Sequence, residues 1–143
     1  MSGSAVTIYH NPVCGTSHNT LGLIRNTGID PAIIEYLKTP PVRSTLESLI
    51  ARMNVPVRAL LREKGTPFAD LDLGASHWTD AQLINFMLTQ PIRINRPIVV
   101  RPWGVKLCRP SEAVLDILPM PQKAPFTKED GEVVISAGGE RVR

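Results

Sequence analysis

Residues 5–28 decide the fold, and they read AVTIYHNPVCGTSHNTLGLIRNTG. The apolar run over 5–9 is typical of a short buried strand. The pattern over 16–27 predicts a helix with apolar positions on one side, which Gly28 closes. Cys14 therefore lies in the turn between a buried strand and the start of a helix.

The rest of the chain alternates between strand and helix signals. The periodicity and the chain breakers predict a strand over 32–37 and then a helix opened by a capping box at Ser44–Glu47. A helical turn over 57–61, a loop over 63–78 and a helix opened by a second capping box at Thr79–Gln82 follow. The last predicted elements are a hairpin of strands over 98–100 and 105–108 and a helix from Pro110 through Leu118. This order, βαβ and then ββα, predicts an α/β fold with a thioredoxin-like mixed sheet and a helical insertion.

The length and composition fit one globular domain. The chain has 143 residues, of which 43% are hydrophobic and 20% charged. We expect a single domain over 1–143. Its tail, from about residue 119, is expected to be less regular, with one short helix around Thr127–Ile135.

The charge and the N-terminus exclude several classes of protein. The net charge is +3 and no run of Lys or Arg forms a nucleic-acid-binding stripe, so we expect no nucleic-acid partner. No apolar run approaches the ~20 residues that span a bilayer, and no signal-peptide pattern is present. With two cysteines only, the expected compartment is the reducing cytoplasm.

Cys14 is the residue best placed for chemistry. A helix N-terminus carries unpaired N–H groups and positive partial charge, which favour both a thiolate and a bound oxyanion. Gly15 allows close approach of the backbone, and Thr16 and Ser17 add hydroxyl donors. His10 could lower the thiol pKa as a cation, or order the loop as a neutral ring. The alternative is a buried structural cysteine, which free cysteines often are.

The spacing around Cys14 excludes three other thiol sites. A dithiol redox motif needs a second cysteine where Ser17 stands, and a phosphatase loop of the Cys-x5-Arg type needs an arginine where Thr20 stands. Two cysteines and three scattered histidines do not form a zinc site. A monothiol enzyme that borrows its second thiol from a partner remains.

Three arginines stand at the ends of predicted elements: Arg62, Arg96 and Arg109. Guanidinium groups bind tetrahedral oxyanions in a bidentate way, although any single arginine is more often a solvated surface residue. Pro97, just before a strand, is a candidate for a cis peptide bond. Cys108 is interpreted as a half-buried core thiol, with a resolving thiol as the alternative.

Separated motifs carry a resemblance to a known family: His10-Asn11-Pro12-Val13-Cys14-Gly15-Thr16-Ser17, Arg58-Ala59-Leu60-Leu61-Arg62, Ile94-Asn95-Arg96-Pro97-Ile98-Val99-Val100, Leu107-Cys108-Arg109-Pro110-Ser111 and Phe126-Thr127-Lys128-Glu129-Asp130-Gly131. In order and spacing they resemble the glutathione- and glutaredoxin-coupled bacterial arsenate reductases. One departure is His18, where members of the family often carry an arginine.

The resemblance implies a site and a reaction. Cys14 would be the nucleophile, Arg62, Arg96 and Arg109 would bind the oxyanion, and the Arg96–Pro97 bond would be cis. Arsenate would be the substrate, glutathione a co-substrate and glutaredoxin the protein partner. The resemblance implies neither a metal nor a tightly bound cofactor.

Two other functions stay open at this stage. The first is a glutathione-dependent thiol oxidoreductase that acts on another substrate, since proteins of one fold diverge in substrate. The second is a redox-sensing transcription regulator that binds RNA polymerase. The regulators we would compare carry a Cys-x-x-Cys switch, which Ser17 breaks here.

Overall fold

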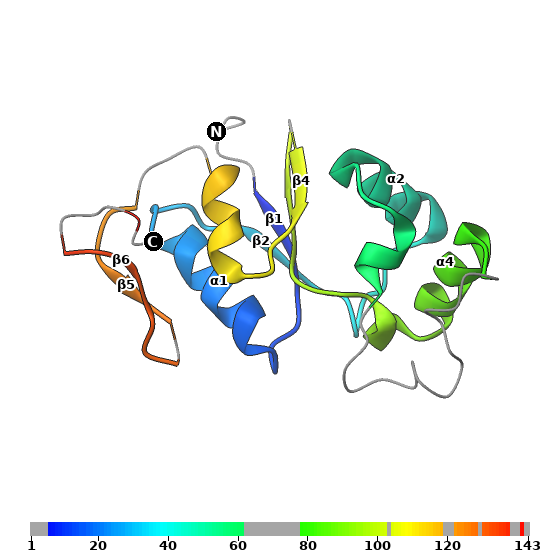
Figure 1. The fold of residues 1–143 in the computed structure, drawn as a ribbon, viewed down its shortest axis with the longest axis horizontal. Coiled ribbons are helices and arrows are strands. Elements are labelled where there is room, and N and C mark those ends of the chain that lie inside the picture. The colour runs from blue at the N-terminus through cyan, green and yellow to red at the C-terminus, as the bar shows by residue number, and fades with distance from the viewer. Residues whose placement is uncertain are drawn as a thin grey trace.

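The computed structural model describes residues 6–61, 78–102, 104–118, 122–128, 130–137 and 141. The elements follow in the order β1 (Thr7–His10), α1 (Gly15–Arg25), β2 (Ala32–Glu35), α2 (Arg43–Met53), the 3-10 helix η2 (Val57–Leu60), α4 (Asp80–Thr89), the 3-10 helix η3 (Pro91–Arg93), β3 (Ile98–Arg101), β4 (Gly104–Leu107), the 3-10 helix η4 (Ser111–Asp116), β5 (Phe126–Thr127) and β6 (Val133–Ile135) (Figure 1). This confirms the predicted βαβ and ββα halves with helices between them. Most of the loop predicted over 63–78 lies outside the described residues.

A mixed four-stranded sheet joins the two halves of the chain. Its strand order is β2-β1-β3-β4, with β1 parallel to β2 and antiparallel to β3, and with β3 antiparallel to β4. Ile8 in the central strand β1 lies opposite Ile33 of β2 and Val99 of β3. The register therefore places the end of β1, which leads to Cys14, beside the start of β3, which follows Arg96.

The strands send alternate side chains into two cores, one on each face of the sheet. Ile8 and Val99 point to the face covered by α1 and η4, where they pack with Leu23 and Val114. Ile98 points to the opposite face, covered by α2 and α4. The central strands β1 and β3 have packing on both faces, whereas the edge strand β2 is partly exposed, so the loops at the ends of β1 and β3 start from a rigid base.

The two predicted capping boxes have different outcomes. At Thr79 the prediction is confirmed: Thr79 Oγ1 accepts from the Gln82 backbone N–H at 3.2 Å, and Thr79 N donates to Gln82 Oε1 at 2.8 Å. At Ser44 it is wrong, because α2 starts at Arg43 and its N-cap, Val42, makes no side-chain cap bond. Glu47, the acidic member of the predicted box, instead accepts from Arg43 Nε at 3.1 Å, and Arg43 also donates to Asn85 of α4 at 2.7 Å.

The C-terminal part of the chain differs from its predictions. The helix expected around Thr127–Ile135 is wrong, since β5 and β6 pair there as an antiparallel hairpin. Gly131, at φ +94°, supports the turn between the strands, and the β-branched residues of β6 suit a strand better than a helix. The helix predicted from Pro110 is the shorter 3-10 helix η4, with Pro110 at its N-cap.

The tail fastens onto α1. Gln122 Nε2 donates to the Leu23 carbonyl at 2.8 Å, and Asn26 Nδ2 donates to Gln122 Oε1 at 2.7 Å. The Phe126 ring lies so close to Gly22 that an added Cβ would sit 2.7 Å from it, so a larger residue here would force the ring to move. The helix that follows Cys14 is thereby held on its outer side as well as by the sheet.

Among the described residues, no helix combines the length and the apolar character that crossing a membrane would require.

Candidate active site

Cys14 occupies the N-cap position of α1, as the sequence predicts. Its backbone is extended, with φ −98° and ψ 121°, and its own N–H donates to the Asn11 carbonyl at 3.0 Å. The first turn of α1 contains no acidic side chain. The residue is 8% exposed, so its sulfur is sheltered yet lies at the positive end of the helix.

A network of hydrogen bonds holds the loop before Cys14. Ser17 Oγ accepts from the Asn11 N–H at 3.1 Å and pairs with His10 Nδ1 at 2.7 Å. Asn11 Oδ1 in turn accepts from the Val13 N–H at 3.0 Å. His10, Asn11 and Ser17 are all buried, so the loop has one well-defined shape. Thr16, by contrast, uses its carbonyl to accept from the Thr20 hydroxyl at 2.8 Å.

Asn11 is a site-ordering residue that the sequence analysis did not single out. Its side chain closes an Asx turn onto the residue two positions later, a known habit of asparagine before a turn. The Asn11-Pro12 pair was the available signal. His18, interpreted as solvated or structural, contacts the Pro12 carbonyl through Nε2 and stacks edge-on against His10 at 5.2 Å between ring centroids.

His10 behaves as an ordering residue in this geometry. Its pKa lies below the ordinary value of 6.5, first because of burial and then because of the nearby His18. A neutral ring lends no positive charge to Cys14. The loop-ordering interpretation of His10 is therefore the one that the geometry favours.

Two of the three predicted arginines lie beside Cys14. Arg109 Nη1 is 3.9 Å from Cys14 Sγ and donates to the Arg96 carbonyl at 3.0 Å. The Arg96 guanidinium reaches Asn95 Oδ1 at 3.5 Å, while its buried Nε has no acceptor among the described residues. Arg62, the third predicted arginine, lies outside the described residues.

A proline follows each of these arginines: Pro97 leads into β3, and Pro110 is the N-cap of η4. The Arg96–Pro97 peptide bond, the candidate cis bond, is cis, and so is Arg109–Pro110. Pro97 is buried, and its carbonyl accepts from the Cys108 N–H at 2.9 Å. The start of β3 and the end of β4 therefore lie side by side, which brings Arg96 and Arg109 together.

The surroundings of Cys14 favour its thiolate. Burial raises the pKa of Cys14, but the Ser17 N–H, the Arg96 charge, the Arg109 guanidinium and the Thr16 N–H together outweigh burial and leave the pKa below its ordinary value. A thiolate at neutral pH is a nucleophile, whereas a thiol is not. Gly15, the first residue of α1, is exposed and leaves the approach to the helix end open.

Cys108 has the opposite character. It is fully buried, and burial raises its pKa to about 12. The predicted core thiol is thus buried more completely than expected, and its full burial and raised pKa both disfavour the alternative role as a resolving thiol.

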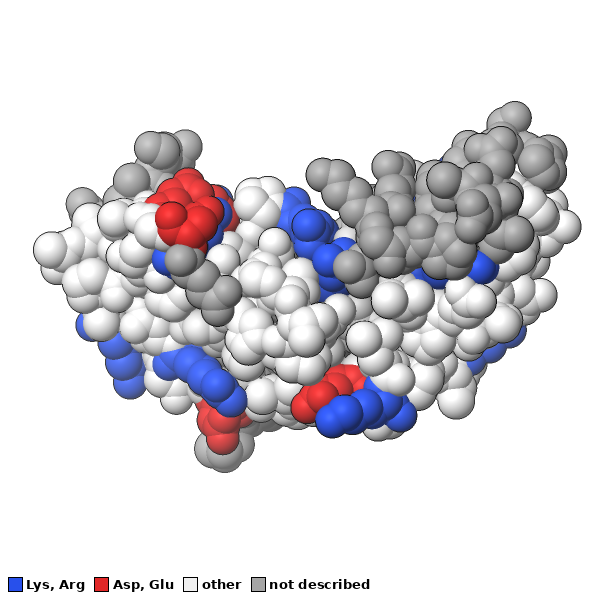
Figure 2. All heavy atoms as spheres, turned by 90° about the horizontal axis from the view of Figure 1, so that it is seen from below, with Lys and Arg blue, Asp and Glu red and all other residues white. Residues whose placement is uncertain are grey.

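The face that holds the site is basic at its centre. Figure 2 views the end of the molecule where α1 begins, and it shows one group of Lys and Arg side chains near the middle and others toward the edges, where the Asp and Glu side chains also lie. Such a distribution attracts a small anion toward the middle of this face. Within the described residues, no group of three or more His, Cys, Asp or Glu side chains could hold a metal ion.

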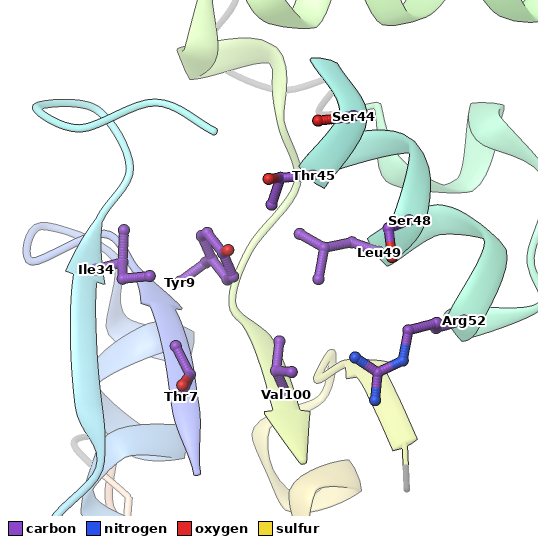
Figure 3. Close-up of a pocket in the computed structure, with 9 residues that line it drawn as sticks. All are labelled: Thr7, Tyr9, Ile34, Ser44, Thr45, Ser48, Leu49, Arg52 and Val100. Carbon is purple, nitrogen blue, oxygen red and sulfur yellow. The ribbon is translucent and has the colours of Figure 1, made fainter. Parts of the chain in front are cut away.

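A separate groove of about 420 Å³ lies on the α2 face of the sheet, between α2 and β1, and Figure 3 shows its lining: Thr7, Tyr9, Ile34, Ser44, Thr45, Ser48, Leu49, Arg52 and Val100. None of the residues that surround Cys14 belongs to this lining. The candidate active site is therefore the N-terminal end of α1, beside Arg96 and Arg109, and not this groove.

The mixed sheet with helices on both sides, and with Cys14 at the start of its first helix, defines a protein of thioredoxin-like fold. The sequence model of the ArsC family matches residues 9–117, and the chain belongs to that family. It is 61% identical to an arsenate reductase of Rhizobium meliloti over 137 residues, which cover 96% of this chain and 98% of that protein. It is also 61% identical to an arsenate reductase of Escherichia coli over 140 residues, covering 98% of this chain and 99% of that protein.

Solved structures agree with the fold. An arsenate reductase from Vibrio cholerae superposes with a TM-score of 0.77 at 41% identity, over 81% of this chain and 99% of that one. The thioredoxin-like fold predicted from the order of elements is confirmed.

Proposed function

We propose that this protein reduces arsenate to arsenite, with Cys14 as the nucleophile. Relatives at 61% identity over nearly the whole chain carry the name arsenate reductase. The observation that carries the proposal is the Cys14 sulfur at the N-terminus of α1, with the Arg109 guanidinium 3.9 Å away. A thiolate needs a positive environment, and so does a doubly charged tetrahedral oxyanion, so one arrangement serves both.

Binding and bond formation come first in the proposed reaction. Arsenate enters the basic face, and its oxygens accept hydrogen bonds from the first N–H groups of α1 and from Arg96 and Arg109. Arg62 is the third arginine in this proposal. The Cys14 thiolate attacks arsenic, an S–As bond forms, and one arsenate oxygen leaves as water after protonation. Electrostatic stabilisation of the crowded anion supplies the main catalytic effect.

Reduction follows with thiols from outside the chain. A glutathione thiolate adds to the adduct, and a disulfide forms between glutathione and Cys14. The electron pair of the S–As bond stays on arsenic, which becomes As(III) and departs as arsenite. A glutaredoxin thiolate then attacks the glutathione sulfur and releases Cys14 as a thiolate. This scheme uses no metal and no tightly bound cofactor, and it suits a reducing cytoplasm.

A coupled assay tests the proposal. Arsenate-dependent oxidation of NADPH is followed with glutathione, glutaredoxin and glutathione reductase, for the native protein and for Cys14→Ser. Activity that needs arsenate, glutaredoxin and Cys14 together is the expected result. Without such activity in a folded protein that carries a free thiol, the substrate or the reductant is misassigned. A thiol oxidoreductase acting on another substrate would then be the better description.

A further inference from the structure

The exposed loop beside Cys14 carries an unexpected apolar side chain. Val13 is 88% exposed, more than the other large hydrophobic residues that the structure describes as exposed. We propose that Val13 is the contact through which a protein thiol reductant docks over Cys14. This inference rests on the proposed function in one respect, namely that Cys14 passes through a mixed disulfide with a small thiol.

The burial of Cys108 makes an outside reductant necessary. The chain has two cysteines, and Cys108 is fully buried with its pKa raised to about 12. It cannot supply the thiolate that would release Cys14 from a mixed disulfide. A reductant must therefore approach from solvent, over the loop that precedes α1.

Val13 is held in place on that loop. Its N–H donates to Asn11 Oδ1 at 3.0 Å, and the next N–H, of Cys14, donates to the Asn11 carbonyl at 3.0 Å. His18 contacts the carbonyl of Pro12, the residue before it. An apolar side chain displayed on an ordered loop loses little entropy on binding, so it is a pre-organised contact.

The geometry of disulfide exchange brings a partner onto Val13. Cys14 is 8% exposed, and a disulfide bond adds one sulfur at only about 2.05 Å from Sγ. A protein thiolate that attacks this second sulfur must bring its own surface against the residue next to Cys14. Glutathione, a tripeptide, can reach Cys14 without covering Val13. Val13 should therefore matter for the protein reductant and not for the small thiol.

The charges around Cys14 indicate which charges the partner's surface should carry. Arg109 is exposed beside Cys14, and the first turn of α1 has no acidic side chain. A group of basic side chains lies near the middle of this face (Figure 2). The partner that fits is a thiol reductant whose reactive cysteine lies in an apolar patch with acidic groups around it.

The test separates this docking step from arsenate chemistry. Cys14 of the native protein, of Val13→Ser and of Val42→Ser is first converted to its glutathione disulfide with oxidised glutathione, and release by glutaredoxin is then followed. Val42, 65% exposed at the N-cap of α2, is the matched control because it is an exposed valine outside the site. Serine is uncharged, so the thiol pKa of Cys14 should not change.

For Val13→Ser the KM for glutaredoxin should rise about tenfold, since burying one valine side chain is worth roughly that factor. In Val13→Ser, the kcat and the rate at which arsenate and glutathione modify Cys14 should stay at native values. In Val42→Ser, the KM for glutaredoxin should also stay at its native value. An unchanged KM in Val13→Ser, or an equal rise in Val42→Ser, would overturn the inference. If native protein shows release by glutaredoxin but no arsenate-dependent modification, the proposed function fails while the docking test still stands.

Discussion

Cys14 lies at the N-cap of α1 and Cys108 directly follows β4. Both residues are buried, yet their surroundings shift the pKa values of the two thiols in opposite directions. Cys14 is 8% exposed and Cys108 is 0% exposed. The pKa of Cys14 lies below its ordinary value, whereas the pKa of Cys108 is raised to about 12. Exposure alone does not account for the opposite directions of these two pKa shifts.

The difference comes from what each sulfur faces. Cys14 has the Ser17 and Thr16 N–H groups and two guanidinium groups around it. Cys108 packs in the core between α1 and η4, and its sulfur donates weakly to the Lys106 carbonyl at 3.6 Å. Donors stabilise a thiolate, while an apolar core and a carbonyl acceptor favour the neutral thiol.

Substituting the two cysteines one at a time should give the largest difference in arsenate turnover. Cys14→Ser should reduce arsenate turnover below about one thousandth of the native rate, because the nucleophile is lost. Cys108→Ala should keep the native kcat and lose about 1 kcal/mol in the free energy of unfolding, because it leaves a small cavity. The coupled assay and urea denaturation measure these effects. Comparable loss of activity in both variants would remove the distinction between the two cysteines.

Removing one guanidinium should have the next largest effect. Arg109→Ala and Arg96→Ala should each lower kcat/KM for arsenate by roughly 10²-fold, as the loss of an oxyanion donor does in other enzymes. Arg52→Ala, on the far side of the sheet, is the matched control and should retain native kinetics. Native kinetics in both Arg96→Ala and Arg109→Ala would contradict the role of the arginines.

The loop network should contribute mainly to stability. Ser17→Ala leaves the His10 ring and the Asn11 N–H without their buried partner, so the free energy of unfolding should fall by about 1–3 kcal/mol. Thermal or urea denaturation measures the loss, and Thr16→Ala, whose side chain is not part of this network, is the comparison. Equal stability of the two variants would mean that the network does not hold the loop.

The smallest expected effect is a shift in pH dependence. A thiol whose pKa is lowered is ionised at a lower pH, so the alkylation rate of Cys14 should reach half of its plateau below pH ~8.5. Arg109→Ala should move this midpoint upward. Cys108 should remain unmodified over the same range until the protein unfolds. Iodoacetamide kinetics followed by mass spectrometry measure both thiols, and a Cys14 midpoint above pH ~8.5 is the contradicting result.

Local patterns predicted the framework around Cys14 well. The strand, the turn and the helix of residues 5–28 are strong signals because periodicity and breakers agree there. The capping box at Thr79 is also local, and it is confirmed. The one predicted at Ser44 is wrong: α2 starts one residue earlier, at Arg43, and Glu47 pairs with Arg43 instead of closing the box.

The tail and the meeting of the arginines required long-range information. The segment over 127–135 is short enough that its sequence is compatible with either a helix or a hairpin. The pairing of β5 with β6 stabilises the hairpin. Arg96 and Arg109 converge because β3 and β4 pair, and a hairpin prediction alone does not fix where their side chains point. The sequence does not predict the ordering role of Asn11, because a single asparagine in a turn is a weak signal.

The most direct measurement of the central claim is the mass of Cys14 after reaction. The native protein is incubated with arsenate and glutathione without glutaredoxin, quenched at low pH, digested and analysed by mass spectrometry. The account predicts one glutathione on the Cys14 peptide, none on the Cys108 peptide, and none on either when arsenate is omitted. Modification of Cys108, or modification of Cys14 that proceeds equally without arsenate, would contradict it.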